Sequence, residues 1–217
     1  MKLFVDSADI ATIEKLNHFG VVDGVTTNPT LIARSGGELF PTLKTICSTV
    51  DGPVSAQVVA TQSDAMVREG EKLAGIAENI VVKVPMTWEG VRACSILSAR
   101  NIHVNVTLCF SANQAILAAN AGASFISPIL GRLDDIGNEG VALIESIRAI
   151  YDNAGTATEI LAASIRSQLH VTLVAEYGAD VATIPPRVFE QLSHHPLTDA
   201  GLASFLADWE KTGMSIG

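Results

Sequence analysis

The residue with the most distinctive chemistry is a lysine inside an apolar run. Lys83 stands in the segment Val81–Pro85, VVKVP, which is typical of a strand buried on both faces. Burial penalises an ammonium ion, so we expect the pKa of Lys83 to be lowered and its neutral amine to act as a nucleophile. Such an amine attacks a carbonyl carbon to form a Schiff base. The alternative is a structural lysine held in an ion pair with Asp6.

Two further residues near the ends of apolar runs could assist that chemistry. The carboxylate of Asp6 could hold an ammonium or transfer protons, and the amide of Gln57 could orient a water molecule. Asp6 could instead cap a helix that opens near residues 7–9.

A set of uncharged polar side chains ends several of the same runs. Amides and hydroxyls bind the hydroxyls of a polyol without adding charge. The candidates for such a site are Thr27, Asn28, Asn105, Thr107 and Ser127. For Asn28 and Thr107 a loop or capping role is the alternative.

Two arginines and a serine form a candidate anion site. Guanidinium groups bind phosphate oxygens in a bidentate manner, and Arg132 and Arg166 are both near strand ends. Ser164 lies just before an expected helix, whose amino-terminal N–H groups favour an anion. The alternative for Arg132 is a surface salt bridge to Asp134 or Asp135.

These residues need a scaffold that brings strand ends together. Short β-branched runs alternate with segments whose apolar spacing is near 3.6 residues. The predicted strands are Leu3–Asp6, Gly24–Thr27, Val54–Val58, Ile80–Val84, His103–Thr107, Phe125–Pro128, Glu159–Ala162 and Val181–Ile184. The predicted helices are Ala11–Leu16, Pro41–Thr49, Gln62–Ala77, Gly90–Ala99, Ala112–Ala121, Gly140–Tyr151, Ser167–Glu176, Arg187–Ser193 and Leu197–Lys211.

Eight strands that alternate with helices predict a single (β/α)₈ TIM barrel over residues 1–217, with an extra C-terminal helix. The barrel places the carboxyl ends of all strands around one mouth. An open doubly wound sheet is less favoured because the chain has no GxGxxG turn. We expect the last helix, Leu197–Lys211, to pack back on the barrel.

The composition excludes several classes of partner. The formal net charge of -9 disfavours nucleic acids and anionic membranes. The three cysteines, Cys47, Cys94 and Cys109, form no CxxC pair, so we expect neither a disulfide framework nor a zinc site. With no expected signal peptide or membrane helix, a cytoplasmic location is predicted.

Six blocks of the chain, taken together, resemble the transaldolase family, and in particular its compact branch, which includes fructose-6-phosphate aldolase. The blocks are Phe4–Ala8 (FVDSA), Gly24–Thr30 (GVTTNPT), Val81–Pro85 (VVKVP), Asn105–Leu108 (NVTL), Ser127–Asp135 (SPILGRLDD) and Ala162–Arg166 (AASIR). They occur in order and extend the resemblance over nearly the whole chain.

The resemblance implies a role for each candidate. Lys83 would be the Schiff-base lysine, Asp6 the acid/base, and Thr107 a residue that positions the water used in proton transfer. Asn28 would hold a dihydroxyacetone hydroxyl. Arg132, Ser164 and Arg166 would bind the phosphate of fructose 6-phosphate or of the acceptor aldose. The family needs no metal and no organic cofactor, and its compact members assemble as pentamers or decamers whose C-terminal helix reaches over a neighbour.

Two residues depart from the transaldolase pattern. Transaldolases carry Glu where this chain has Gln57, whereas the aldolase branch carries Gln. At Ile129, transaldolases have Phe and the aldolase branch has Tyr. The resemblance therefore leaves open whether the chain transfers dihydroxyacetone or releases it.

Two other readings remain. Related Schiff-base barrels, such as deoxyribose-phosphate aldolase and type I dehydroquinase, place their lysine on strand six, where this chain has Phe125–Pro128. The last reading is a non-catalytic barrel that binds a sugar phosphate. A buried amine would add nothing to such a binder.

Overall fold

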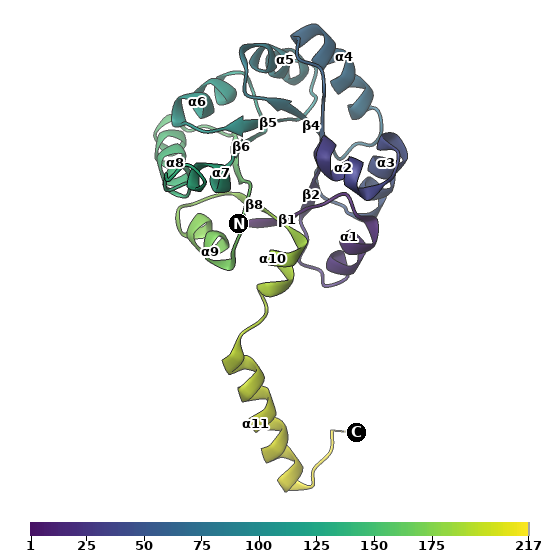
Figure 1. Ribbon diagram of the computed structural model, residues 1–217, viewed down its shortest axis with the longest axis vertical. Coiled ribbons are helices and arrows are strands. Elements are labelled where there is room, and N and C mark those ends of the chain that lie inside the picture. The colour runs from purple at the N-terminus through teal and green to yellow at the C-terminus, as the bar shows by residue number, and fades with distance from the viewer. Residues whose placement is uncertain (217) are drawn as a thin grey trace.

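Eight strands close into one parallel barrel in the computed structural model, which describes residues 1–216 (Figure 1). The strands are β1 (Lys2–Asp6), β2 (Gly24–Thr26), β3 (Val54–Gln57), β4 (Ile80–Pro85), β5 (Val104–Cys109), β6 (Phe125–Pro128), β7 (Glu159–Ala162) and β8 (Val181–Ile184). They are joined in chain order, and β8 pairs with β1 to complete the ring. The predicted (β/α)₈ barrel and its extra C-terminal helix are confirmed.

Helices follow the strands and, except for the last one, surround the ring. They are α1 (Ile10–Asn17), α2 (Pro29–Ser35), α3 (Leu39–Thr49), α4 (Ser63–Ala74), α5 (Trp88–Ser98), α6 (Ala112–Asn120), α7 (Leu130–Asp134), α8 (Ala142–Ala154), α9 (Gln168–Glu176), α10 (Pro186–Gln191) and α11 (Pro196–Thr212). The short helices α2 and α7 were not expected. Both follow directly on residues at a strand end, and Figure 1 shows them on opposite sides of the ring.

The two faces of each strand have different environments. Val82 and Val84 of β4 point outward and join the core under the helices, whereas Val81 points into the barrel. The inward residues near the amino ends of the strands form an apolar plug of Phe4, Val81, Phe125, Leu161 and Val181. The rings of Phe4 and Phe125 meet edge to face at 6.3 Å.

A glycine makes room for this plug. A Cβ built on Gly24 would lie 2.7 Å from the ring of Phe4, so β2 tolerates no larger residue there.

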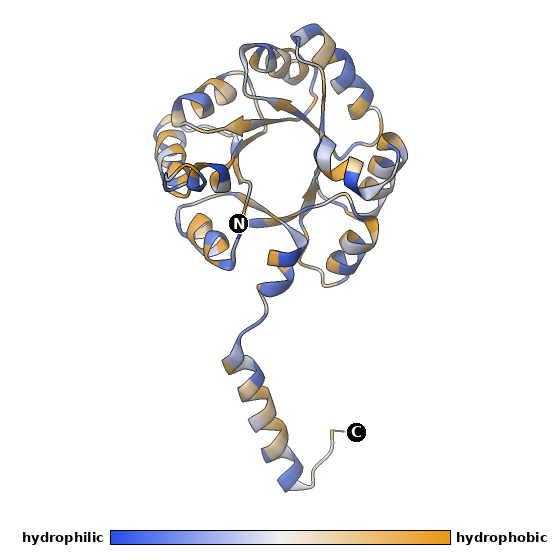
Figure 2. Ribbon diagram, in the orientation of Figure 1, coloured by the Kyte–Doolittle hydropathy of each residue, from blue (hydrophilic) through white to orange (hydrophobic). Residues whose placement is uncertain are grey.

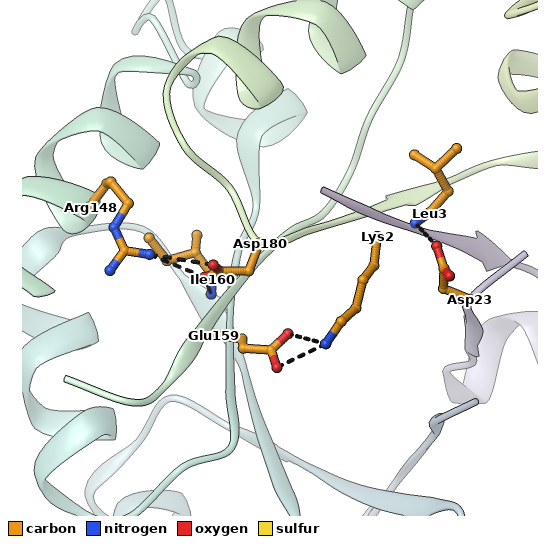
Figure 3. A network of polar contacts seen from close by, with 7 residues as sticks. All are labelled: Lys2, Leu3, Asp23, Arg148, Glu159, Ile160 and Asp180. Carbon is orange, nitrogen blue, oxygen red and sulfur yellow. Dashed lines mark hydrogen bonds and ion pairs between the residues drawn. The ribbon is translucent and has the colours of Figure 1, made fainter. Parts of the chain in front are cut away.

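Polar contacts fasten the amino-terminal edge where the ring closes (Figure 3). Lys2 on β1 pairs with Glu159 on β7 at 2.9 Å. Asp180, just before β8, accepts from the backbone N–H of Ile160 at 2.7 Å and pairs with Arg148 on α8 at 3.3 Å. These contacts join β7, β8 and β1 at the end opposite to the expected site.

The prediction that the last helix packs back on the barrel is wrong. Helix α11 extends away from the ring, and none of its residues is buried (Figure 1). Its large apolar side chains are all exposed, and Figure 2 shows orange and tan residues recurring between blue ones along the helix. These side chains are Leu197, Leu202, Phe205, Leu206 and Trp209. The apolar pattern correctly indicated a helix, but within residues 1–216 no other segment covers its apolar side chains.

Candidate active site

A cavity of about 560 Å³ opens at the carboxyl ends of the strands. Its lining consists of Asp6, Asn28, Pro29, Thr30, Leu31, Arg34, Gln57, Lys83, Thr107, Leu108, Ile129, Arg132, Ala163, Ser164 and Thr183. A larger cavity of about 730 Å³ lies at the other end, between the plug and the helices α6 and α8. We assign the candidate site to the smaller cavity because it holds the buried amine and a buried carboxylate, and because barrel sites lie at this end.

Lys83 enters the cavity from β4. The alternation that points Val82 and Val84 outward points Lys83 inward, one layer above Val81, and the side chain is 7% exposed. Its Nζ donates to the carbonyl oxygen of Thr27 at 3.4 Å, a long contact, and no carboxylate lies within 4 Å among residues 1–216. Burial lowers the pKa of Lys83 and the field of Asp6 partly opposes this. The amine is therefore less basic than an ordinary lysine.

Asp6 faces the same cavity from the end of β1. Its Oδ1 accepts a hydrogen bond from the hydroxyl of Thr26 at 2.8 Å. Burial raises the pKa of this carboxyl, while Lys83 and the Thr26 hydrogen bond act in the opposite direction. The capping role considered for Asp6 belongs to Asp9, whose side chain accepts from the Thr12 backbone N–H at 2.8 Å. Asp6 is thus left free for the cavity.

Three predicted substrate-binding residues lie below or beside the cavity and do not line it. Asn105 and Ser127 are fully buried. Two hydrogen bonds link them to Ser55: the Asn105 amide donates to the Ser55 hydroxyl at 3.2 Å, and the Ser127 hydroxyl donates to the Asn105 amide oxygen at 2.7 Å. The hydroxyl of Thr27 donates to the Ser55 carbonyl at 2.7 Å. The side chains of Ser55, Asn105 and Ser127 form a polar floor inside the ring, on the strands that also carry Gln57 and Thr107.

Asn28, Gln57 and Thr107 all line the cavity. The Oδ1 of Asn28 caps α2 by accepting from the Leu31 N–H at 2.9 Å, so the capping role is real, and the amide N–H₂ group remains for a ligand. Gln57 makes no side-chain hydrogen bond within residues 1–216. It is therefore available to hold water.

The backbone beside Thr107 is strained. Leu108 has a φ of 61°, and the pairing of β5 with β6 shifts register between Val106 and Cys109. A bulge of this kind re-aims the side chains next to it. A branched residue in the left-handed region costs energy, and such residues concentrate at functional sites.

The candidate anion site lies across the mouth. Arg132 and Ser164 line the cavity, and Arg132 has no carboxylate within 4 Å among the described residues. Arg166 does not line the cavity but is held next to it by a bidentate pair with Asp135, one arm of which measures 2.6 Å. Ser164 has a φ of 59°, and the helix that follows it, α9, is capped by Ser167 and begins at Gln168, within one residue of the predicted start.

Gly131 is required for this arrangement. A Cβ at Gly131 would lie 2.3 Å from Nε of Arg166 and 2.7 Å from the Ser164 carbonyl oxygen. The absence of a side chain lets Arg166 cross over α7 beside Arg132.

The wall opposite to β1 is apolar. Ile129 is 8% exposed and contacts the apolar cluster that includes Ala163 and Leu108. All three line the cavity. This wall offers no proton donor.

Three polar lining residues, Thr30, Arg34 and Thr183, escaped the sequence reasoning. Arg34 shares one face of α2 with Thr30 and Leu31, at the spacing that aligns side chains on a helix. The pair Asn28-Pro29, a cap followed by proline, was the signal for α2. Thr183 is the single polar residue in VATI, and strand alternation points it to the interior like Val181.

The chain is similar to known proteins over its whole length. Residues 3–216 match the family described as "Transaldolase/Fructose-6-phosphate aldolase". "Probable transaldolase" proteins are 63% identical in Dinoroseobacter shibae and 62% identical in Roseobacter denitrificans, each over 216 residues and all of both chains. A third, from Parvibaculum lavamentivorans, is 59% identical over 217 residues and all of both chains.

Distant solved structures share the fold alone. A 3-hexulose-6-phosphate synthase superposes with a TM-score of 0.67 at 18% identity, over 88% of this chain and 98% of that one. An inosine 5′ monophosphate dehydrogenase from Legionella pneumophila gives 0.61 at 13% identity, over 87% and 58%. Within residues 1–216, no three His, Cys, Asp or Glu side chains are grouped as metal ligands, and no helix could cross a membrane.

Proposed function

This chain belongs to the transaldolase/fructose-6-phosphate aldolase family, and from that membership we infer that it is a transaldolase, which moves a dihydroxyacetone unit between sugar phosphates. The observation that carries the mechanism is the burial of Lys83 without a directly paired carboxylate, in the cavity that also holds Asp6. Burial lowers the pKa of Lys83, so its amine can attack a ketone near neutral pH.

The proposed first half-reaction cleaves the donor. The neutral amine of Lys83 adds to C2 of fructose 6-phosphate or sedoheptulose 7-phosphate, and loss of water gives an iminium ion. The iminium accepts the electron pair of the C3–C4 bond as the C4 hydroxyl loses its proton. Asp6 would take that proton, because burial raises the pKa of its carboxyl and makes the carboxylate a better base. The aldose phosphate leaves, and a three-carbon enamine stays on Lys83.

The proposed second half-reaction rebuilds a ketose. The enamine carbon attacks the aldehyde of an acceptor, the proton returns to the new hydroxyl, and water releases the product from Lys83. Gln57 and Thr107, which both line the cavity, would hold that water. The amide of Asn28 would bind a hydroxyl of the three-carbon unit. Asn105 and Ser127 would act from the polar floor, and Thr27 would act through its hydrogen bond to the Ser55 carbonyl, by holding β2, β3, β5 and β6 in place around that unit.

The proposed phosphate site is the rim formed by Arg132, Ser164 and Arg166. Arg132 is available for a direct bidentate contact, because no carboxylate holds it. Arg166 supplies a second guanidinium whose charge is partly offset by Asp135. Arg34 adds a cation on the opposite rim, because β2 and β6 are four strands apart in the ring.

Borohydride trapping tests this function. Reduction in the presence of fructose 6-phosphate should attach the three-carbon unit to Lys83, located by peptide mass spectrometry. Lys83→Met should abolish the adduct, and Lys44→Met, at an exposed position on α3, should leave it unchanged. An adduct on another lysine, or none, would refute the proposal.

A fructose-6-phosphate aldolase activity is the second candidate. It is favoured by Gln57, because a Gln amide cannot titrate and the aldolase branch carries Gln at this position. Fructose 6-phosphate should be assayed with and without erythrose 4-phosphate. Sedoheptulose 7-phosphate as the dominant product identifies a transaldolase, whereas free dihydroxyacetone identifies an aldolase.

We further propose that α11 covers a neighbouring copy in a pentamer or decamer. Leu202, Phe205, Leu206 and Trp209 follow the i, i+3, i+4, i+7 spacing of one helix face, and all are exposed. Phe205→Glu should dissociate the assembly, as measured by sedimentation velocity. Ser204→Glu, on the opposite face, is the matched control. A monomeric wild type would contradict the proposal.

The three cysteines support a reducing, cytoplasmic location, because all three are free thiols and Cys94 and Cys109 are buried. Immunodetection in cell fractions would test it.

A further inference from the structure

Thr183 is a buried hydroxyl at the edge of the cavity, and the proposed mechanism gives it no task. It lies on β8, is 2% exposed, and still lines the cavity. Its Oγ1 lies 2.6 Å from Oγ1 of Thr26, and this is its side-chain hydrogen bond within residues 1–216. The Thr26 hydroxyl in turn donates to Asp6 at 2.8 Å. Three strands thus contribute one continuous chain of hydrogen bonds.

The number of hydroxyl protons determines the direction of donation along this chain of hydrogen bonds. An ionised carboxylate is acceptor-only, so Thr26 must give its single hydroxyl proton to Asp6 when Asp6 is charged. The contact between the two hydroxyls is then filled by the proton of Thr183. When Asp6 is protonated, its own O–H can donate to Thr26, and Thr26 can turn its proton to Thr183. Thr183 therefore serves as donor in one state and acceptor in the other.

We propose that Thr183 is a positioning residue that acts through Thr26 to hold the Asp6 carboxyl in place and to keep it bonded in both protonation states. The inference deepens the proposed transaldolase function and rests on it. Donation from Thr183 polarises the Thr26 hydroxyl and strengthens its bond to the ionised carboxylate.

The charges around Asp6 are few, which makes the effect measurable. Thr26 on β2 and Thr183 on β8 flank the carboxyl with hydroxyls, and Asn28 lies nearby in the same cavity with an amide. Lys83 on β4 is the charged group whose field acts on Asp6 in the described structure. A substitution at Thr183 leaves the charge of Lys83 in place. A shift in the titration of the Asp6–Lys83 pair can therefore be attributed to the loss of the hydrogen-bond chain.

The test compares Thr183→Val with Thr183→Ser in the full chain. Thr183→Val removes the hydroxyl and should lower kcat about tenfold, the value of one buried hydrogen bond. The acid limb of the pH profile of kcat should move to higher pH, because the ionised form of Asp6 loses support. Thr183→Ser keeps the hydroxyl and should restore both the rate and the profile.

Two controls separate positioning from packing. Thr158→Val also removes one buried threonine hydroxyl, which donates to the Ala123 carbonyl at 2.8 Å next to the other cavity, and should leave the profile unchanged. In a Thr26→Val background, Thr183→Val should have no further effect on the profile, because the chain is already broken. If Thr183→Val does not fold, Thr183→Ala takes its place in the comparison with Thr183→Ser.

The outcomes are distinct from those of the proposed function. A wild-type protein without a borohydride adduct on Lys83 would refute that function and, with it, the role of Thr183. An intact adduct with an unchanged pH profile in the apolar variants would overturn the inference on Thr183 alone. Equal shifts in Thr183→Val and Thr183→Ser would also overturn it.

Discussion

Replacing Arg132 by alanine should separate phosphorylated from unphosphorylated acceptors. Arg132 lines the cavity and has no carboxylate within 4 Å in the described structure, whereas Arg166 is held by Asp135. A phosphate that meets Arg132 therefore gains a full charge-assisted contact. One that meets Arg166 must share it with an existing partner.

The expected magnitude follows from this difference. A hydrogen bond to a charged group contributes ~1.5–3 kcal/mol, which corresponds to about 10- to 150-fold in kcat/KM. Arg132 is exposed at the rim, so we expect the lower part of that range for Arg132→Ala with erythrose 4-phosphate. For Arg166→Ala we expect a loss below about tenfold, because an exposed ion pair is screened by solvent.

The assay measures kcat/KM for erythrose 4-phosphate and for erythrose, with fructose 6-phosphate as the common donor at saturation. Arg132→Ala should lose activity with the phosphorylated acceptor and change little with the other. Arg68→Ala, at an exposed position on α4, is the control for a general loss of positive charge. Equal losses with both acceptors, or a larger loss for Arg166→Ala, would refute this assignment.

Three further predictions concern the cavity and its rim. The field of Asp6 raises the pKa of Lys83, so Asp6→Asn should lower the pKa of Lys83. Borohydride trapping with dihydroxyacetone, measured against pH, should then show its acid limb at lower pH, and a shift to higher pH would contradict the coupling. Gln57→Glu adds a titratable group beside the water site and should raise the ratio of sedoheptulose 7-phosphate to free dihydroxyacetone, measured chromatographically; an unchanged or lower ratio would count against the role of Gln57. Gly131→Ala places a methyl group against Arg166 and the Ser164 carbonyl, so thermal unfolding should show about 1–3 kcal/mol of destabilisation together with weaker binding of sugar phosphates, whereas a neutral variant would argue against the close contact.

Sequence reasoning located the strands because their periodicity is strong. The run around Lys83 has one polar residue between two valines, and in the structure Lys83 points inward and the two valines point outward, as strand alternation predicts. The separation of Asn105 from the cavity did not follow from the pattern. Alternation gives the direction of a side chain, but depth along a tilted strand depends on how the ring is staggered.

The missed residues have physical reasons. Arg34 lies on a seven-residue helix, too short for a clear apolar period. Thr183 is a single polar residue in an apolar run. Its hydrogen-bond partner, Thr26 on β2, is brought next to it only by the pairing of β8 with β1. The apolar face of α11 was recognisable in the sequence, but an apolar helix face does not identify the surface that covers it.

The apolar plug has a kinetic consequence. Phe4, Phe125, Leu161 and Val181 fill the ring below the polar floor, and the residues that line the cavity around Lys83 lie at the carboxyl ends of the strands, so we expect sugars to enter and leave at that end. The aldose that leaves and the aldose that binds next must therefore pass through the same opening one after the other. The first aldose has to vacate the barrel before the second can reach the enamine, which predicts a substituted-enzyme scheme with parallel double-reciprocal plots.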